Sequence, residues 1–454
     1  MNIYLTYLVI TILLTGVFVV TRNIESKEEE YFVLNKTENT FGLSISFYAS
    51  GMGLWILTSP AEVAWYGLGF DIYGYAISAA SPFLLIYIFG PKISKLVPNG
   101  ATLAQFIDKK YGSAAQKIVS LVAVIYMGAF LIAEFASIGF LFESVSLVSG
   151  IMVSSMVALT TFIYLNKTGF KASYLTDKIQ GVGIVLLLAL IFGIWFSQNS
   201  MNEISNFANI GGLNTFETFS LKSAIAVIIA VTAAEIFSTG YWQRTFSALN
   251  DVTIKKASVY SGFGVFITIL LLGIAGAVGA GKGLETPSLS FIEQLSLNSF
   301  TVIVLISLAT LLVTSSVDTL ENAISSTISL DIIKKGSKEA NFITFGVIVI
   351  ALFLSTRVSN IFSVFLVADL LATCLVFPAF YKIKKSSTNI MLIIPFIGSM
   401  LSVLVYRGLF MGLEDNPGGL FVPTDLYGLA DLNTFIVALF SSLILTVVLD
   451  RLMK

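Results

Sequence analysis

The chain has 454 residues, of which 56% are hydrophobic and only 12% are charged, and its formal net charge is −1. A soluble domain would carry charge on about a quarter of its residues, so this composition excludes a soluble protein. The sequence has no histidine and one cysteine, Cys374. It therefore has no Cys/His metal site, no histidine-dependent nucleophile and no internal disulfide, and we expect neither an enzyme nor a nucleic-acid-binding protein.

Apolar blocks recur along the whole chain, each close to the ~20 residues that a helix needs to cross a bilayer. They lack the alternation over about ten residues that marks membrane β-strands, so we expect an all-α polytopic membrane protein. About thirteen transmembrane helices are predicted, at 3–20, 42–69, 71–91, 116–146, 148–166, 171–197, 220–246, 257–280, 298–333, 341–356, 360–381, 389–406 and 432–450. Short surface helices are expected at 102–111 and 286–296.

The basic residues orient these spans. If the N-terminus lies outside, only four of the 26 Lys and Arg residues fall on the outer side, namely Lys222, Lys282, Arg357 and Arg407. The other 22, Arg244 among them, fall on the inner side, and an excess of Lys and Arg marks cytoplasmic loops. We therefore expect the N-terminus outside and the C-terminus inside, in the cell (inner) membrane.

Two of the spans contain helix-breaking residues. The second span has Gly51, Gly53 and Pro60 at mid-depth, where glycine costs ~1 kcal/mol and proline ~3 kcal/mol in a helix. The seventh span has a polar, glycine-containing set at similar depth, namely Glu235, Ser238, Thr239 and Gly240. Non-helical backbone at this depth is tolerated only where it is buried in protein or lines a cavity, so both spans are predicted to be discontinuous.

These two spans are five apart and cross in opposite directions, as in an inverted repeat of five plus five helices with binding sites at the breaks. A glycine-rich packing face is the alternative explanation. We expect one membrane domain made of four parts. These are an extra N-terminal span with its loop (1–41), a first repeat (42–197), a second repeat (220–381) and two C-terminal spans (389–454).

Acidic residues are frequent at membrane depth, namely Glu62, Glu134, Glu235, Asp318, Glu321 and Asp369. A charge at the bilayer centre costs roughly 2.5–3.5 kcal/mol on insertion scales. No lysine or arginine is expected at comparable depth, so these carboxylates must be protonated or paired with something that enters from water. A cationic solute is one such partner. For Glu62, Glu134 and Glu321, hydrogen bonds to backbone or an aqueous vestibule are the alternative, and the roles of Glu62 and Glu321 stay open.

Four local patterns, in order along residues 31 to about 335, resemble the sodium/solute symporter family. They are Tyr31-Phe32-Val33-Leu34; Gly169-Phe170-Lys171-Ala172 followed by Thr176-Asp177-Lys178-Ile179-Gln180; Gln243-Arg244; and Ser315-Ser316-Val317-Asp318 followed by Asp331-Ile332. The resemblance implies a LeuT-like fold and sodium-coupled symport of a small solute by alternating access. The stretch Tyr241-Trp242-Gln243-Arg244 resembles urea and polyamine carriers of the family more than sugar carriers. Trp55-Ile56 stands where the sugar carriers have a polar pair, so the sequence is nearer to urea, polyamine and proline carriers.

The resemblance also implies a sodium site. Its ligands would be the carbonyls of Ala49, Met52 and Leu312 and the hydroxyls of Ser315 and Ser316. Such neutral oxygens suit a hard cation, although the hydroxyls have interhelical hydrogen bonding as an alternative role. Asp177, Asp318 and Thr319, with Ser315, form a hypothetical second sodium site. An ion pair of Asp177 near the cytoplasmic end, with Lys171 or Lys178, is its alternative.

For the substrate, the resemblance places the second, fourth, seventh and eleventh spans around a central cavity. The predicted substrate residues are Trp55, Ile56, Glu134, Glu235, Ser238 and Asp369. An amine-bearing or cationic solute is one hypothesis, and urea or a zwitterionic amino acid such as proline is the other. Proton coupling through Glu235 or Asp369, and a channel or transporter-like sensor, are the rival functions.

The remaining expectations concern partners. The run from Gly276 to Gly283 resembles a nucleotide-binding loop but ends in glycine where such a loop has Ser or Thr, so ATP is not expected. We expect a monomer or weak homo-oligomer in the lipid bilayer.

Overall fold

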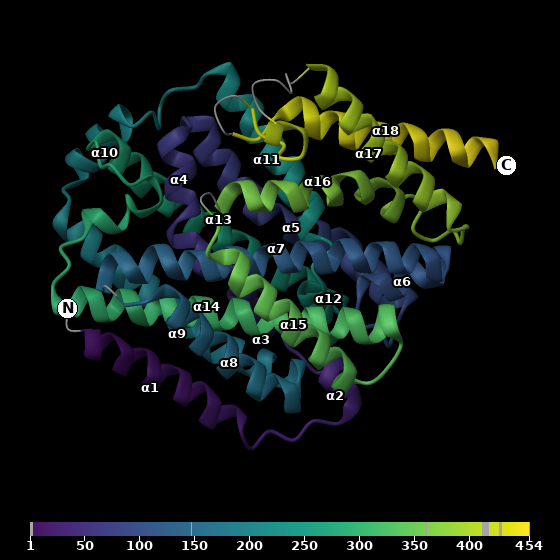
Figure 1. The fold of residues 1–454 in the computed structure, drawn as a ribbon, viewed down its shortest axis with the longest axis horizontal. Helices are drawn as coiled ribbons and strands as arrows, with labels where there is room; N and C mark the ends of the chain where they lie inside the picture. Colours follow the sequence, from purple (N-terminus) through teal and green to yellow (C-terminus); the bar gives the residue numbers. More distant parts are fainter. Residues whose placement is uncertain (1–2, 147, 359–360, 411–416, 426–428, 454) are drawn as a thin grey trace.

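The structure is a computed structural model that describes residues 3–146, 148–358, 361–410, 417–425 and 429–453. These residues form a bundle of helices (Figure 1), with two isolated β-bridges. The first half contains α1 (Ile3–Thr21), α2 (Glu28–Phe32), α3 (Thr40–Gly51), the 3₁₀ turn η1 (Leu54–Leu57), α4 (Ser59–Tyr66), α5 (Gly69–Leu96), α6 (Leu103–Tyr111), α7 (Ser113–Ser146), α8 (Gly150–Thr168), α9 (Phe170–Gln198) and α10 (Met201–Ile210).

The second half begins at α11. It contains α11 (Thr218–Glu235), α12 (Thr239–Ser247), α13 (Asp251–Gly281), the 3₁₀ turns η2 (Pro287–Leu289) and η3 (Ile292–Gln294), α14 (Ser299–Thr327), the π-helical turn η4 (Ile328–Ile333), α15 (Ser337–Ser355), α16 (Ile361–Phe380), α17 (Ile390–Phe410), the 3₁₀ turn η5 (Pro417–Leu420) and α18 (Leu432–Leu452). The predicted surface helix at 102–111 is therefore present as α6, whereas the one at 286–296 is only two short turns.

Ten of these helices are long and apolar enough to cross a membrane, and the bent pair of α3 with η1–α4 makes up to eleven. Two further predicted spans, α8 and α15, are helical but do not pass the same test of length and hydropathy. The chain is thus a multi-pass, all-helical membrane protein. The count of thirteen crossings and the orientation remain predictions.

The centre of the bundle is α14, which is buried over 78% of its apolar stretch. It packs against α7, α8 and α9, and also against α3 and η1. α1 and the pair α17–α18 lie at opposite margins in Figure 1. A helix with apolar residues on every side belongs at the core of a membrane bundle, and α14 carries its polar residues there as well. It is therefore the element on which a buried polar site can be built.

Tight turns position the helices around this core. α9 begins at Gly169, whose φ of +57° suits glycine and whose missing side chain admits the Tyr31 carbonyl, 2.4 Å from where a β-carbon would be. At the start of α6, the Thr102 hydroxyl accepts a hydrogen bond from the Gln105 amide, and the Gln105 side chain accepts from the Thr102 amide. Such reciprocal caps fix where a helix begins.

Candidate functional site

The second span is broken, as the sequence predicts. α3 ends at Gly51, the chain runs extended at Gly53, and the helix axis bends by 65° before α4. Glu134 on α7 lies in this break, and its Oε2 accepts a hydrogen bond of 2.8 Å from the Leu54 amide. The carboxylate thus satisfies one of the amide groups that the interruption leaves without an intrahelical partner.

The seventh span is interrupted in the same way. α11 ends at Glu235, α12 begins at Thr239, and residues 236–238 between them are not helical. The Trp242 ring nitrogen donates a hydrogen bond of 2.6 Å to the Ile236 carbonyl, so a buried side chain takes up a backbone acceptor at the break. At each interruption a buried side chain thus pairs with one backbone group, as broken helices in a bilayer require.

Of the five residues of the predicted sodium site, Ala49 and Met52 lie at the first break, and Leu312, Ser315 and Ser316 lie on α14, a helix that packs against α3 and η1. Ala49, Met52, Leu312, Ser315 and Ser316 are all at most 1% exposed. The Ser315 hydroxyl donates its hydrogen to Asp177 Oδ1 at 2.9 Å, which leaves its lone pairs available. Among the described residues, Ser316 Oγ makes no hydrogen bond within normal distance and angle limits, but it lies close enough to the Glu134 carboxylate to interact with it. A buried hydroxyl with only this loose contact can turn its oxygen toward a cation.

A cavity of about 570 Å³ lies beside this break. Its lining includes three of the predicted substrate residues, Trp55, Glu235 and Asp369. A second cavity of about 300 Å³ is lined by Ser238 and again by Glu235. The two cavities share Tyr126, Phe130, Glu235 and Tyr241, so they adjoin one another.

Aromatic rings surround the carboxylates of the first cavity. Trp55 makes edge-to-face contacts with Tyr75, Phe130 and Phe365, at centroid distances of 6.2 to 6.3 Å. The Trp55 ring nitrogen and Asp369 Oδ2 are both buried without a hydrogen-bond partner among the described residues. The cavity wall thus presents one free donor, one free carboxylate oxygen and several ring faces.

Two predicted substrate residues take other positions. Ile56 is fully buried, and Glu134 is fully buried in the break, where Gly53 leaves room for its carboxylate. Neither is among the residues that line the two cavities. The aromatic residues Tyr75, Tyr126, Phe130 and Phe365 were not predicted. Their helical spacing is typical of core packing, and the sequence holds no further signal that would have singled them out.

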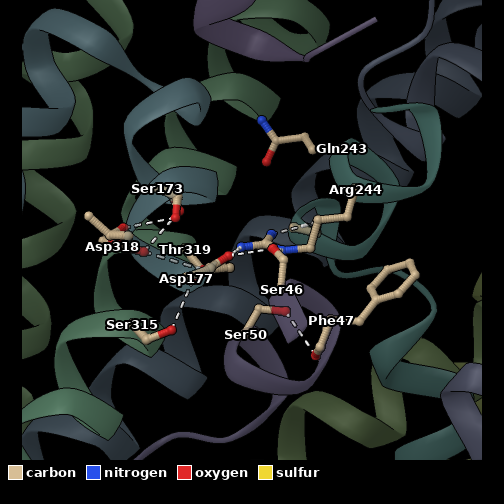
Figure 2. Close-up of polar contacts among 12 residues, drawn as sticks. Ser46, Phe47, Ser50, Ser173, Asp177, Gln243, Arg244, Ser315, Asp318 and Thr319 are labelled. Atoms are coloured by element: carbon tan, nitrogen blue, oxygen red, sulfur yellow. Dashed lines mark hydrogen bonds and ion pairs between the residues drawn. The ribbon is translucent and has the colours of Figure 1, made fainter. Parts of the chain in front are cut away.

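One expectation is wrong. The sequence placed Arg244 at the cytoplasmic end of the seventh span and expected no basic residue at the depth of the acids. In the structure Arg244 is fully buried and ion-paired with Asp177 (Figure 2). Counting spans along the sequence does not predict the burial of Arg244. The helix starts again after the break as α12, and the Arg244 side chain points between α3, α9 and α14 instead of toward water.

Two of the four sequence patterns meet where the segment before α3 contacts α12. The Gln243 side-chain nitrogen on α12 donates to the Phe32 carbonyl at 2.8 Å, to Asn322 Oδ1 at 2.9 Å and to Ser326 Oγ at 2.9 Å. The Tyr31 hydroxyl donates to Asn341 at 2.7 Å. The segment before α3 is thus held against α12, α14 and α15.

Comparisons with known proteins agree with this architecture. No family model matches the chain. A spermidine transporter of Candida albicans is 26% identical over 385 residues, which cover 82% of this chain and 72% of the relative. A sodium-coupled sialic acid symporter, in a substrate-bound outward-open structure, superposes with a TM-score of 0.77 at 16% identity, covering 98% of this chain and 97% of the other.

A second solved structure is a nucleobase–cation symporter in a closed conformation. Its TM-score is 0.59 at 13% identity, with 93% of this chain and 94% of the other covered. The structural matches show the LeuT-like fold that was expected. Together with the curated relative, they indicate a multi-pass secondary transporter of small solutes rather than an enzyme.

Proposed function

We propose that the chain is a sodium-coupled symporter, a member of the sodium/solute symporter family, that carries a small solute with protonated amines. The observation on which the substrate class rests is the cavity that combines two carboxylates, Glu235 and Asp369, with aromatic walls. Among the described residues that line it, none is basic. A solute with an ammonium group suits both features of this cavity. The ammonium pairs with the carboxylates, and it also lies favourably over the faces of the aromatic rings.

The relative from Candida albicans supports the same class, since spermidine is a chain of amines. The two adjoining cavities share Glu235, so its carboxylate can pair with an amine in either of them. Urea or a zwitterionic amino acid would leave at least one of the two carboxylates without a cation, at the cost of a buried charge.

Sodium coupling is supported by the oxygens at the first break. Ser315 and Ser316 on α14, with the carbonyls of Ala49, Met52 and Leu312, would hold Na⁺. Bound there, Na⁺ would tie the broken span to α14 and so favour one of the alternating states. The Ser316 hydroxyl, which makes only a loose contact with Glu134, and the hydrogen bond that orients Ser315 agree with this role.

The test is uptake into proteoliposomes that hold the purified protein. We expect radiolabelled spermidine to accumulate when sodium is imposed outside at equal pH on both sides, and urea and proline to compete weakly. Glu235→Gln and Asp369→Asn should each weaken spermidine uptake by an order of magnitude or more, since each removes a charge that pairs with an amine. Unchanged spermidine affinity in both variants would remove the case for a cationic solute.

The same vesicles separate the rival functions. Uptake that follows a pH gradient and ignores sodium would indicate proton coupling through Glu235 or Asp369. Counterflow exchange of labelled against unlabelled solute is expected of a carrier that is closed alternately on its two sides. Flux without counterflow would indicate a channel, and binding without flux would indicate a sensor.

A further inference from the structure

The guanidinium of Arg244 is the centre of a polar cluster built from four helices (Figure 2). Nε donates to Ser46 Oγ on α3 at 2.8 Å, and Nη1 donates to the Gly240 carbonyl on α12 at 2.8 Å. Nη2 donates to Thr319 Oγ1 on α14 at 2.8 Å and forms an ion pair with Asp177 Oδ2 on α9. The side chains of Arg244 and Asp177 are both fully buried.

This cluster occupies the hypothetical second sodium site. Asp177 Oδ2 already accepts from Arg244 and, at 2.6 Å, from Ser46, while Oδ1 accepts from Ser315. The Thr319 hydroxyl oxygen accepts from Arg244. Two of the three expected ligands therefore coordinate a guanidinium, and a sodium ion at the same carboxylate would meet a positive charge that cannot lose its proton.

The third expected ligand is also engaged. Asp318 accepts hydrogen bonds from the hydroxyls of Tyr164 at 2.6 Å, Thr176 at 2.8 Å and Ser173 at 2.9 Å. These three donors point their hydrogens at the carboxylate and together satisfy its buried charge. The residues at this position therefore accommodate the guanidinium of Arg244, with Asp318 beside it accepting hydrogen bonds from hydroxyl groups. They do not fit a second sodium ion.

We propose that Arg244 is a resident cation that replaces the second sodium, so that this chain binds a single sodium ion, at the break in the second span. Asp177 is then a positioning residue: it holds the Ser315 hydroxyl through Oδ1 and the guanidinium through Oδ2. This inference rests on the proposed sodium coupling and adds its stoichiometry. It also assigns a role to the Gln243-Arg244 pattern, which the sequence left as the end of a span.

Equilibrium binding of ²²Na⁺ to the purified protein in nanodiscs tests the stoichiometry without any transport assay. Wild type should bind one sodium ion per chain, with a Hill coefficient of about 1. Arg244→Ala frees Asp177 and should bind a second ion. Arg244→Lys keeps the charge and should bind one, as should the double variant Arg244→Ala/Asp177→Asn, which removes both charges together.

The outcomes separate this proposal from the one that it rests on. Two sodium ions bound to wild type would overturn the role of Arg244 and leave sodium coupling intact. No sodium bound to wild type, in a preparation that still binds spermidine, would overturn the sodium coupling itself, and the single-ion stoichiometry with it. If Arg244→Ala does not fold, the wild type and the charge-free double variant still decide, because a second ion in either would contradict the proposal.

Discussion

Glu134 and Gly53 lie in direct contact at the break in the second span. A β-carbon placed on Gly53 would be 1.8 Å from Glu134 Oε1, which is far closer than any non-bonded contact allows. Glycine is therefore required at this position by the carboxylate on the facing helix, and its tolerance of irregular backbone is a secondary reason.

Gly53→Ala should consequently displace Glu134 or reshape the break. We expect a loss of about 1–3 kcal/mol of stability, as for other overpacked sites, together with loss of uptake. Gly128→Ala on α7 is the matched control, since a β-carbon there would have nothing within 4 Å. Melting temperatures of the two variants in detergent should differ clearly, and equal values would contradict this account of the contact.

Glu134→Gln keeps the shape of the side chain and an acceptor for the Leu54 amide, but removes the charge. The Glu134 carboxylate lies beside the side chain of Ser316, one of the proposed sodium ligands, so a sodium ion bound by Ser316 would be close to it. We expect the sodium concentration for half-maximal uptake to rise about tenfold, which corresponds to ~1.4 kcal/mol. The exposed Glu293→Gln on η3 should leave it unchanged. A normal sodium dependence in Glu134→Gln would limit Glu134 to a structural role.

The two serines of α14 should respond differently to alanine. Ser316→Ala removes a hydroxyl that makes only a loose contact with Glu134, so it should raise the half-maximal sodium concentration severalfold while the melting temperature in potassium changes little. Ser315→Ala should do the same and also lower that melting temperature, because the buried Asp177 loses a donor, a loss of about 1–3 kcal/mol. Thermal shifts measured in sodium and in potassium distinguish the two effects. Identical shifts for both variants would contradict this assignment.

Lys110 provides a test that depends on pH. It lies on α6, outside the spans, and donates to the carbonyls of Ala379 and Tyr381 at the end of α16. Burial lowers the pKa of the Lys110 amine to about 7. An unfolded chain keeps this proton up to about pH 10.4, so between pH 7 and 10 the unfolded state binds more protons and stability should rise with pH.

Lys110→Met should flatten that rise, whereas the exposed neighbour Lys109→Met should preserve it. Melting temperatures at pH 6.5 and pH 9 are sufficient for the comparison. If the wild-type melting temperature rises between these two pH values by no more than that of Lys110→Met, the pKa shift of Lys110 is contradicted.

The sequence predicted those features that depend on local chemistry. The glycines and proline of 49–60 indicated the first break, and the polar set at 235–240 indicated the second. What it did not predict depends on side chains that meet from distant helices. Arg244 is 67 residues from Asp177 and 198 from Ser46, and only the restart of α12 inside the bundle brings the three together. The aromatic lining of the cavity was missed for the same reason, because apolar rings on four different helices resemble ordinary core residues.

The first cavity takes its lining from α3, η1, α5, α7, α11, α12, α13 and α16, and among the described residues that line it none comes from α14. The helix with the sodium hydroxyls thus contributes no described residue to the lining of the first cavity, and it reaches the second only through Thr319 and Leu320. Selection for a new transported compound can therefore work on the rings and carboxylates of the other helices while the ion-driven step is inherited unchanged. Carriers of one architecture would then diversify in cargo faster than in energy source.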